Sequence, residues 1–221
     1  PPPSLGTSPG DDARPVRYRR LLEVDGAPTA ITLILRSDGV AVESPRDTLE
    51  GVVELVTWWF DLDTDPAPVA SRLSRDSRLA PLVVQRPALR PLRHPVGFEA
   101  AVDTVLGQQV TLTSARLFAQ RLRTAYSPGA VAGLARFPSP ETLVGAPTEE
   151  LRAAVGLTTA RATTVRAVAA LFADGFRLGP GSDPAAARAA LLGVPGIGPW
   201  TVERISSSTS SAGCAARPTG A

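Results

Sequence analysis

The chain contains no lysine, so all 23 of its basic residues are arginine. An intermediate in which an enzyme amine forms a Schiff base with a substrate normally needs a lysine side chain, and its absence argues against that chemistry. The chain also holds one histidine, His94, and one cysteine, Cys214. These counts argue against a zinc site of His and Cys ligands, a disulfide framework, and a Ser-His or Cys-His nucleophilic pair.

Long apolar runs and targeting signals are missing as well. No run of 18 apolar residues occurs, and the N-terminus lacks the charged and apolar regions of a signal peptide, so we predict a cytoplasmic chain outside the membrane. Methionine and asparagine are also absent, as expected of a GC-rich coding sequence that replaces Lys by Arg. The arginines therefore indicate either that coding bias or a surface for bidentate phosphate contacts, and the net charge of +2 leaves both readings open.

Changes in composition divide the chain into four segments. Residues 1–15 are rich in Pro, Gly and charge and predict a flexible leader. Residues 16–92 predict a small α+β domain, in which β-prone runs at 18–24, 29–35 and 40–42, separated by Asp-Gly turns, form antiparallel hairpins. Apolar residues at helical spacing over 48–60, among them Leu49, Val53 and Phe60, predict a helix that covers the sheet.

The second half of the chain has a helical pattern. Residues 93–205 place apolar side chains at the spacing of a packed helical bundle. Asp183 precedes Pro184, a pair that predicts the capped start of a helix over 184–192. Residues 206–221 form a Ser-rich, low-complexity tail that we place outside the domain. The predicted fold class is therefore α+β, a small antiparallel sheet domain followed by an all-α domain.

The segment Leu192-Gly-Val-Pro-Gly-Ile-Gly-Pro-Trp200 carries the most specific chemistry. Gly196 and Gly198 can take a positive φ or let a ligand approach the backbone, and Pro199 begins a helix whose first N–H groups face the turn. Such a turn suits a nucleic-acid phosphate, although Pro and Gly also build turns without ligands.

Several motifs occur together in one order, and with them the chain resembles the helix-hairpin-helix DNA glycosylases, within them the DNA-3-methyladenine glycosylase II (AlkA-type) family. The resemblance covers roughly residues 16–205. The motifs that carry it are Phe60-Asp-Leu-Asp63 with Asp65-Pro66, Leu79-Ala-Pro-Leu82 with Arg86-Pro87, Gly97-Phe-Glu99, Val105-Leu-Gly-Gln-Gln-Val110, Phe137-Pro138, and residues 192–203.

The resemblance implies a monomeric base excision repair enzyme without an organic cofactor. Such an enzyme flips alkylated purines out of duplex DNA and hydrolyses the N-glycosidic bond without cleaving the strand. By the same resemblance, backbone carbonyls of Leu192, Val194 and Ile197 would hold a monovalent cation that bridges to a DNA phosphate. Amides at Gly196, Ile197 and Gly198 would bind that phosphate.

Two further roles follow from the resemblance. Trp200 would line the base pocket, where an indole face favours a cationic alkylated purine over a neutral base; the alternative is that Trp200 packs its helix onto the bundle. Gln108 and Gln109 fall in the turn where the family inserts a wedge, the side chain that fills the gap left by the flipped nucleotide, and Gln109 would occupy the wedge position. Two glutamines at the end of a helix can equally be solvated polar residues.

The chain departs from the family after Glu203. The family places its catalytic Asp a little over a dozen residues beyond the hairpin, but no Asp or Glu follows Glu203, and Arg204 stands where a pocket aromatic residue is usual. We therefore expect a truncated or frameshifted sequence that lacks the C-terminal helices and the catalytic carboxylate. Such a chain would be inactive, and apolar faces around Phe118 and Leu171 would be left uncovered.

Other carboxylates offer poor replacements. Glu203 fits a surface or capping role, and Glu99 and Asp103, four residues apart on one helix, fit a pair of like charges facing solvent. Asp61, Asp63 and Asp65 lack the Gly and the twelfth-position Glu of a calcium loop and fit helix caps instead.

Two other functions remain as alternatives. A non-enzymatic DNA-binding module would hold phosphates with its hairpin and arginines and would not discriminate alkylated or abasic sites. A glycosylase for oxidised or mismatched bases is the other. The lack of lysine and of a cysteine set for an iron–sulfur cluster argues against the lyase and cluster-bearing branches of that class.

Overall fold

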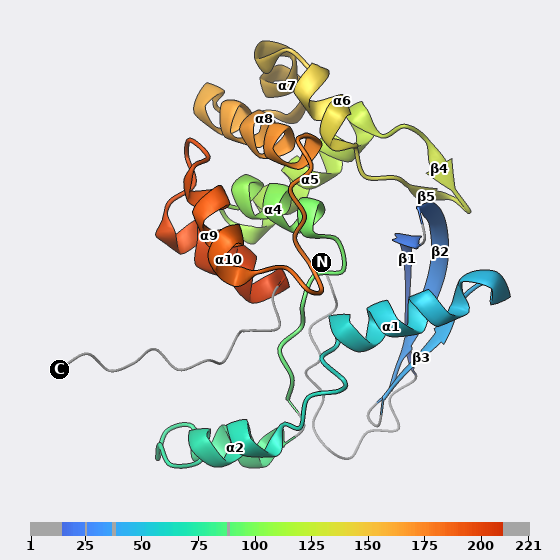
Figure 1. Ribbon diagram of the computed structural model, residues 1–221, viewed down its shortest axis with the longest axis vertical. Coiled ribbons are helices and arrows are strands. Elements are labelled where there is room, and N and C mark those ends of the chain that lie inside the picture. Colours follow the sequence, from blue (N-terminus) through green and yellow to red (C-terminus); the bar gives the residue numbers. More distant parts are fainter. Residues whose placement is uncertain (1–14, 25, 37–38, 88, 210–221) are drawn as a thin grey trace. The chain divides into compact units, whose positions relative to one another are not determined.

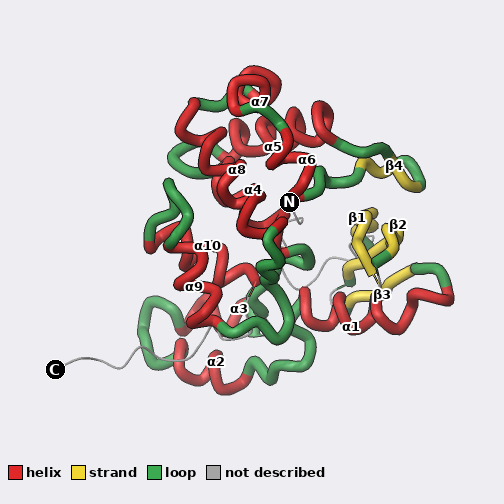
Figure 2. Tube along the Cα trace, turned by 45° about the horizontal axis from the view of Figure 1, so that its top comes forward, coloured by secondary structure: helices red, strands yellow, loops and turns green. Residues whose placement is uncertain are grey.

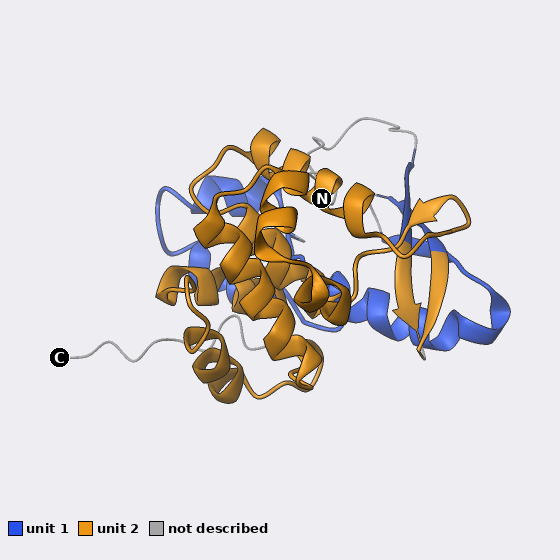
Figure 3. Cartoon of the chain, turned by 90° about the horizontal axis from the view of Figure 1, so that it is seen from above, with its two compact units in different colours: residues 1–20, 31–92 blue, residues 21–30, 93–221 orange. Residues whose placement is uncertain are grey.

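A computed structural model of the chain, shown in Figure 1, describes residues 15–24, 26–36, 39–87 and 89–209. Most of the predicted leader, the end of the predicted tail, and the aspartates of both predicted Asp-Gly turns lie outside the described residues. The chain divides into two compact units, one of residues 1–20 and 31–92 and the other of residues 21–30 and 93–221, coloured blue and orange in Figure 3.

The N-terminal half contains the predicted small sheet. Strands β1 (Val16–Val24), β2 (Ala27–Leu35) and β3 (Val40–Glu43) are hydrogen-bonded in that order, and β2 runs antiparallel to β3 with Leu33 opposite Val42. Side chains of a strand alternate between its faces, and β2 accordingly buries Thr29, Ile31, Leu33 and Leu35 and leaves the residues between them more exposed.

Helix α1 (Leu49–Trp59) follows a 3₁₀ turn, η1 (Arg46–Thr48), and confirms the helix predicted next to the sheet. It buries Val52, Val56 and Trp59, and the Trp59 ring meets the ring of Tyr18 on β1 edge-on at 6.4 Å between centroids. Leu49 and Val53 were predicted on the buried stripe and are instead 40% and 46% exposed. The prediction was wrong for these two because the face through Val52, Val56 and Trp59 is narrower than the whole apolar pattern.

Two short helices, α2 (Ala67–Leu73) and α3 (Ala80–Gln85), occupy the Pro-rich segment after α1. Asp65 Oδ1 accepts the N–H of Ala67, the first residue of α2, at 2.9 Å, as predicted for a capping carboxylate. Asp61 has another role, because its backbone has a φ of 55° and its carboxylate accepts the Thr64 hydroxyl at 2.5 Å. The Arg90 guanidinium donates to the Asp61 carbonyl at 2.6 Å, which holds this turn closed.

From residue 97 onward the described chain is mainly helical (Figure 2). A short antiparallel hairpin of β4 (Ala130–Val131) and β5 (Leu134–Ala135) is an interruption that the sequence did not predict. The helices are α4 (Gly97–Leu106), α5 (Leu112–Tyr126), α6 (Pro140–Gly145), α7 (Thr148–Val155), α8 (Thr159–Ala173), α9 (Pro184–Leu192) and α10 (Pro199–Thr209).

Helix α4 lies at the centre of this helical unit and packs against α5, α8 and α10. Its first residue must be glycine, because a Cβ at Gly97 would lie 2.0 Å from the carbonyl oxygen of Leu178. Next to it, the Phe98 ring lies 5.1 Å from the ring of Phe172. Such aromatic pairs add to the free energy gained by burying the rings.

The apolar faces predicted to be uncovered are largely covered. Phe118 and Leu171 are partly buried and pack against the core of the helical unit, so the prediction was wrong for both side chains. The guanidinium of Arg161 lies over the Phe118 ring at 5.8 Å and shields it. Large exposed apolar side chains of this unit include Leu112 and Trp200 instead, 63% and 64% exposed.

Helix α10 continues through Thr209, beyond the boundary expected at residue 205. It buries Val202, Ile205 and Thr209, which lie on one face. The hydroxyls of Ser208 and Thr209 both donate to the Ile205 carbonyl at 2.8 Å, so the Ser-rich sequence satisfies its polar groups inside the helix. No helix in the described part of the chain has the length and hydropathy that crossing a membrane requires.

Candidate functional site

The hairpin predicted from the sequence is formed by α9, the turn after it, and α10. The carboxylate of Asp183 accepts the N–H groups of Ala185 and Ala186, so α9 begins where the capping pattern predicts. Val194 and Ile197 are buried, and the Ile197 N–H donates to the Val194 carbonyl at 3.1 Å. These two apolar side chains fasten the turn to the helical unit.

Gly196 shapes the turn for two independent reasons. Its φ is 86°, a left-handed conformation that L side chains rarely adopt. A Cβ at this position would also lie 2.1 Å from the hydroxyl oxygen of Thr164 on α8. A Cβ at Gly198 would meet no atom within 4 Å. Gly196 is therefore required by the fold, whereas Gly198 leaves open space beside the backbone.

The start of α10 offers donors to a ligand. Pro199 has no N–H, and the N–H groups of Trp200 and Thr201 have no acceptor inside the helix, because the first turn of any helix lacks them. The first intrahelical bond runs from Val202 N to the Gly198 carbonyl at 3.1 Å. Backbone donors at a helix N-terminus attract an anion such as a phosphate.

The carbonyls predicted to bind a monovalent cation lie in the same turn. The Val194 carbonyl accepts one N–H, from Ile197, and a carbonyl oxygen has a second lone pair. Carbonyl oxygens are donors that hard cations prefer. The cation site at the carbonyls of Leu192, Val194 and Ile197 stays a prediction.

Trp200 lies in the first turn of α10 and is 64% exposed. The alternative in which this indole packs the helix onto the bundle is wrong, since Thr201 and Val202 provide the buried face at this point. An exposed tryptophan at this position can stack on a ligand.

The two glutamines of the Gly107-Gln108-Gln109 turn differ in their surroundings. Gln109 is exposed and has a φ of 53°, which is unusual for a residue with a side chain. The Gln108 side chain instead points toward the hairpin, where its amide nitrogen donates to Thr201 Oγ1 at 2.9 Å and to the Gly196 carbonyl at 3.2 Å. Of the two predicted wedge residues, Gln109 is exposed, whereas Gln108 is half-buried and its side-chain amide is bonded to the hairpin.

Arg161 and Thr201 complete this contact, and the sequence did not predict a role for either side chain. Arg161 Nη2 donates to the backbone carbonyl of Gln108 at 2.6 Å, and Thr201 is 4% exposed. Hydrogen-bond partners distant in sequence leave no local pattern. The sequence nevertheless shows one regularity: Arg161 lies five residues after Gly156, and Thr201 lies five residues after Gly196. This shared spacing could have indicated that the two side chains occupy equivalent positions.

The carboxylates near the start of α4 do not face solvent as a pair, contrary to the prediction. Glu99 is only 7% exposed and forms an ion pair with Arg123 of α5. Arg123 Nη2 also lies 3.7 Å from Asp103 Oδ2. The prediction failed because the cation that Glu99 and Asp103 share comes from another helix.

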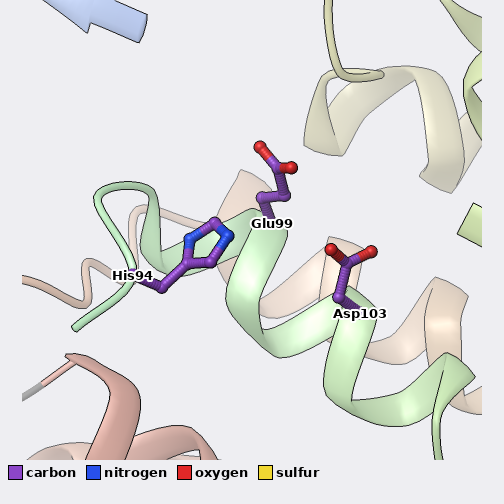
Figure 4. Close-up of side chains that lie close together, drawn as sticks. All are labelled: His94, Glu99 and Asp103. Carbon is purple, nitrogen blue, oxygen red and sulfur yellow. The ribbon is translucent and has the colours of Figure 1, made fainter. Parts of the chain in front are cut away.

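His94 lies beside these acids, as Figure 4 shows, and one ligand atom from each of His94, Glu99 and Asp103 lies within 4.8 Å of the others. Three such side chains can hold a metal ion. Here, however, the Arg123 guanidinium already supplies the positive charge, and His94 Nδ1 lies 2.9 Å from the carbonyl oxygen of Val96. We assign this cluster to the packing of α4 against α5.

Glu203 was considered as a replacement catalytic carboxylate. It lies on α10 and forms an ion pair with Arg188 of α9, and its side chain is 60% exposed. This pair joins the outer faces of the two hairpin helices, which fits the surface role predicted for Glu203.

Two family models match the chain. The model of the AlkA N-terminal domain matches residues 11–94, and that of the HhH-GPD superfamily of base excision DNA repair proteins matches residues 102–213. Two Mycobacterium tuberculosis sequences, from strains CDC 1551 / Oshkosh and ATCC 25618 / H37Rv, are similar, each described as a probable bifunctional transcriptional activator/DNA repair enzyme AlkA. Each is 32% identical over 206 residues, which are 88% of this chain and 40% of the relative's length.

Solved structures show a similar fold. The 3-methyladenine DNA glycosylase of Archaeoglobus fulgidus superposes with a TM-score of 0.72 at 21% identity over 87% of this chain and 67% of that one. The 8-oxoguanine glycosylase/lyase of Clostridium acetobutylicum, in complex with double-stranded DNA that contains cytosine opposite 8-oxoguanine, gives 0.65 at 14% identity over 87% and 68%.

Proposed function

Since the chain belongs to the HhH-GPD superfamily of base excision DNA repair proteins, we propose that it binds duplex DNA at alkylated purines of the 3-methyladenine type. The observation that carries this proposal is the contact of Gln108 with Gly196 and Thr201, which joins the exposed Gln109 turn to the hairpin beside the exposed Trp200. The match to the AlkA N-terminal domain and the similarity to the AlkA relatives support the class of substrate.

In the proposed complex each part of the site has a separate task. The N–H groups at the start of α10 hold a phosphate, Gln109 enters the gap in the duplex, and Trp200 stacks on the flipped base. A monovalent cation on the carbonyls of Leu192, Val194 and Ile197 would supply positive charge next to that phosphate. A purine alkylated at N3 or N7 is cationic, so an indole face attracts it more strongly than a neutral purine.

The hydrolytic step needs a carboxylate that residues 204–221 do not contain. As the glycosidic bond breaks, positive charge develops on the deoxyribose, and a nearby carboxylate stabilises that charge. Glu203 and Glu99 are paired with arginines. We therefore propose that the intact activity is monofunctional hydrolysis, without a lysine-dependent lyase step, and that the 221-residue chain binds damaged DNA but does not excise the base.

Two measurements on the 221-residue protein test this proposal. Fluorescence anisotropy should show tighter binding to a duplex with a tetrahydrofuran abasic-site analogue than to an undamaged duplex of the same sequence. Release of 3-methyladenine from methylated DNA should stay at the level of a protein-free control. If base release is seen and Glu203→Gln abolishes it, the proposed inactivity is wrong and Glu203 is the carboxylate.

A non-enzymatic DNA-binding module is the second candidate, favoured by the lack of Asp and Glu after Glu203. Such a module would grip phosphates and would bind the abasic and undamaged duplexes equally. The same anisotropy comparison therefore decides between the two functions.

A further inference from the structure

Two helix-turn-helix segments of the helical unit are equivalent, with corresponding residues 40 positions apart. The first consists of α7, Gly156 and α8, and the second is the hairpin of α9 and α10. Their turns share a left-handed glycine, with a φ of 85° at Gly156 and 86° at Gly196. Buried side chains occupy corresponding positions in both segments: Leu151 and Leu191, Leu157 and Ile197, Ala162 and Val202, Val165 and Ile205, Ala169 and Thr209.

Gln108 is held by corresponding residues of both segments. Arg161 and Thr201 occupy the same position after their glycines, and they bind opposite ends of Gln108. Arg161 Nη2 donates to the Gln108 backbone carbonyl at 2.6 Å, and the Gln108 amide donates to Thr201 Oγ1 at 2.9 Å. A second bond from that amide reaches the Gly196 carbonyl at 3.2 Å. The turn that ends α4 is thus fastened to both segments through one residue.

The neighbour of Gln108 needs such support. Gln109 has a φ of 53°, and a residue with a side chain keeps this conformation only where its surroundings impose it. The carbonyl bound by Arg161 belongs to the peptide group that links Gln108 to Gln109. The bonds to Arg161, Thr201 and Gly196 therefore fix the direction in which the Gln109 side chain leaves the protein.

We propose that Gln108 is a positioning residue, which holds Gln109 in the geometry for insertion and couples that insertion to phosphate binding at the hairpin. The inference rests on the proposed function, because it presupposes a duplex that Gln109 enters. The Gln108 side chain stays bonded to the hairpin, so Gln108 affects the DNA only through the position of Gln109. Removing either one should then have the same effect on recognition of a damaged site.

The experiment compares wild type, Gln108→Ala, Gln109→Ala and the double variant. Anisotropy gives the preference for an abasic over an undamaged duplex, and 2-aminopurine opposite the abasic site reports unstacking by its fluorescence. We expect each single variant to lose about 10-fold in preference, the scale of one or two hydrogen bonds, together with the fluorescence increase. The double variant should lose no more than the single ones, and affinity for the undamaged duplex should change less than about 2-fold.

Two controls separate positioning from folding. Gln120→Ala removes an exposed glutamine of α5 and should leave the preference unchanged. Thr201→Val removes the hydroxyl that binds Gln108 and keeps the volume of the side chain, whereas Thr201→Ser keeps a hydroxyl. Valine should lower the preference in a protein that melts cooperatively, and serine should restore it. These two variants test the inference even if Gln108→Ala does not fold.

The outcomes are distinguishable. If wild type prefers the abasic duplex and Gln108→Ala keeps that preference, the positioning role is wrong and the proposed function stands. A loss of about 100-fold in the double variant, the product of two 10-fold losses, would also overturn it, because the free energies of independent residues add. If wild type itself shows no preference, the proposed function fails, and the positioning role fails with it.

Discussion

Gly196 and Gly198 lie two residues apart in one turn and yet differ in what they tolerate. Gly196 has a φ of 86° and a Cβ there would meet Thr164 Oγ1 at 2.1 Å, whereas a Cβ at Gly198 would meet nothing within 4 Å. Gly196→Ala should therefore destabilise the fold by about 1–3 kcal/mol, from backbone strain and the forced displacement of Thr164. Urea unfolding followed by circular dichroism measures this change.

Gly198→Ala is the matched control for that substitution. It should change the free energy of unfolding by less than about 1 kcal/mol, because its methyl group enters open space. Equal losses in both variants would show that general backbone stiffness, and not the contact with Thr164, decides the stability of the turn.

The exposed Trp200 gives a second test at the level of a single residue. If it stacks on alkylated purines, 7-methylguanosine, which is cationic, should quench the tryptophan fluorescence more strongly than neutral guanosine. Trp200→Ala should remove that difference. The control is Trp58→Phe on α1, which should keep the difference. Quenching that persists without Trp200 would contradict the assignment of this indole to the base pocket.

Helices α4 and α5 are joined by the buried ion pair of Glu99 and Arg123. Glu99 is 7% exposed, and removing one partner of a buried pair leaves the other charge without compensation. Glu99→Gln should lower the free energy of unfolding by about 1–3 kcal/mol. The loss should be smaller than for a fully buried pair, because the Arg123 side chain is 29% exposed and its Nη2 still lies 3.7 Å from Asp103 Oδ2. Denaturant unfolding measures the loss.

An exposed ion pair on another helix provides the comparison. Arg152 Nε and Glu149 Oε2 of α7 lie 2.7 Å apart, and the Glu149 side chain is 68% exposed. Glu149→Gln should cost less than about 0.5 kcal/mol, since exposed pairs contribute little. If Glu99→Gln costs no more than this, the pair between α4 and α5 is not what holds these helices together.

The 221-residue chain carries a net charge of only +2, so its affinity for DNA must come from local groups rather than from a strongly basic surface. Binding should weaken as salt rises, with a log–log slope of roughly −2 to −4 if the hairpin and nearby arginines contact two to four phosphates. The ratio of affinities for abasic and undamaged duplexes should stay constant, because both offer the same phosphates. A ratio that falls with salt would show that recognition of the abasic site is electrostatic.

Local patterns in the sequence determined much of the secondary structure of this protein. The alternation in β2, the Asp183-Pro184 start of α9 and the Pro-Gly-Ile-Gly turn were each readable, because strand periodicity, capping and turn formation depend on neighbours along the chain. The order of the motifs was likewise enough to indicate the glycosylase family.

Contacts between distant residues were decided only by the tertiary structure. The resemblance assigned the wedge to Gln109 but gave Gln108 no separate role, and Glu99 was predicted to face solvent, yet packing brings Thr201 to Gln108 and Arg123 to Glu99. The partner that sets the role of such a side chain is far along the chain: Thr201 is 93 residues from Gln108, and Arg123 is 24 residues from Glu99. Sequence periodicity reports which face of an element is buried, whereas the partner that a polar group meets there depends on how the elements pack.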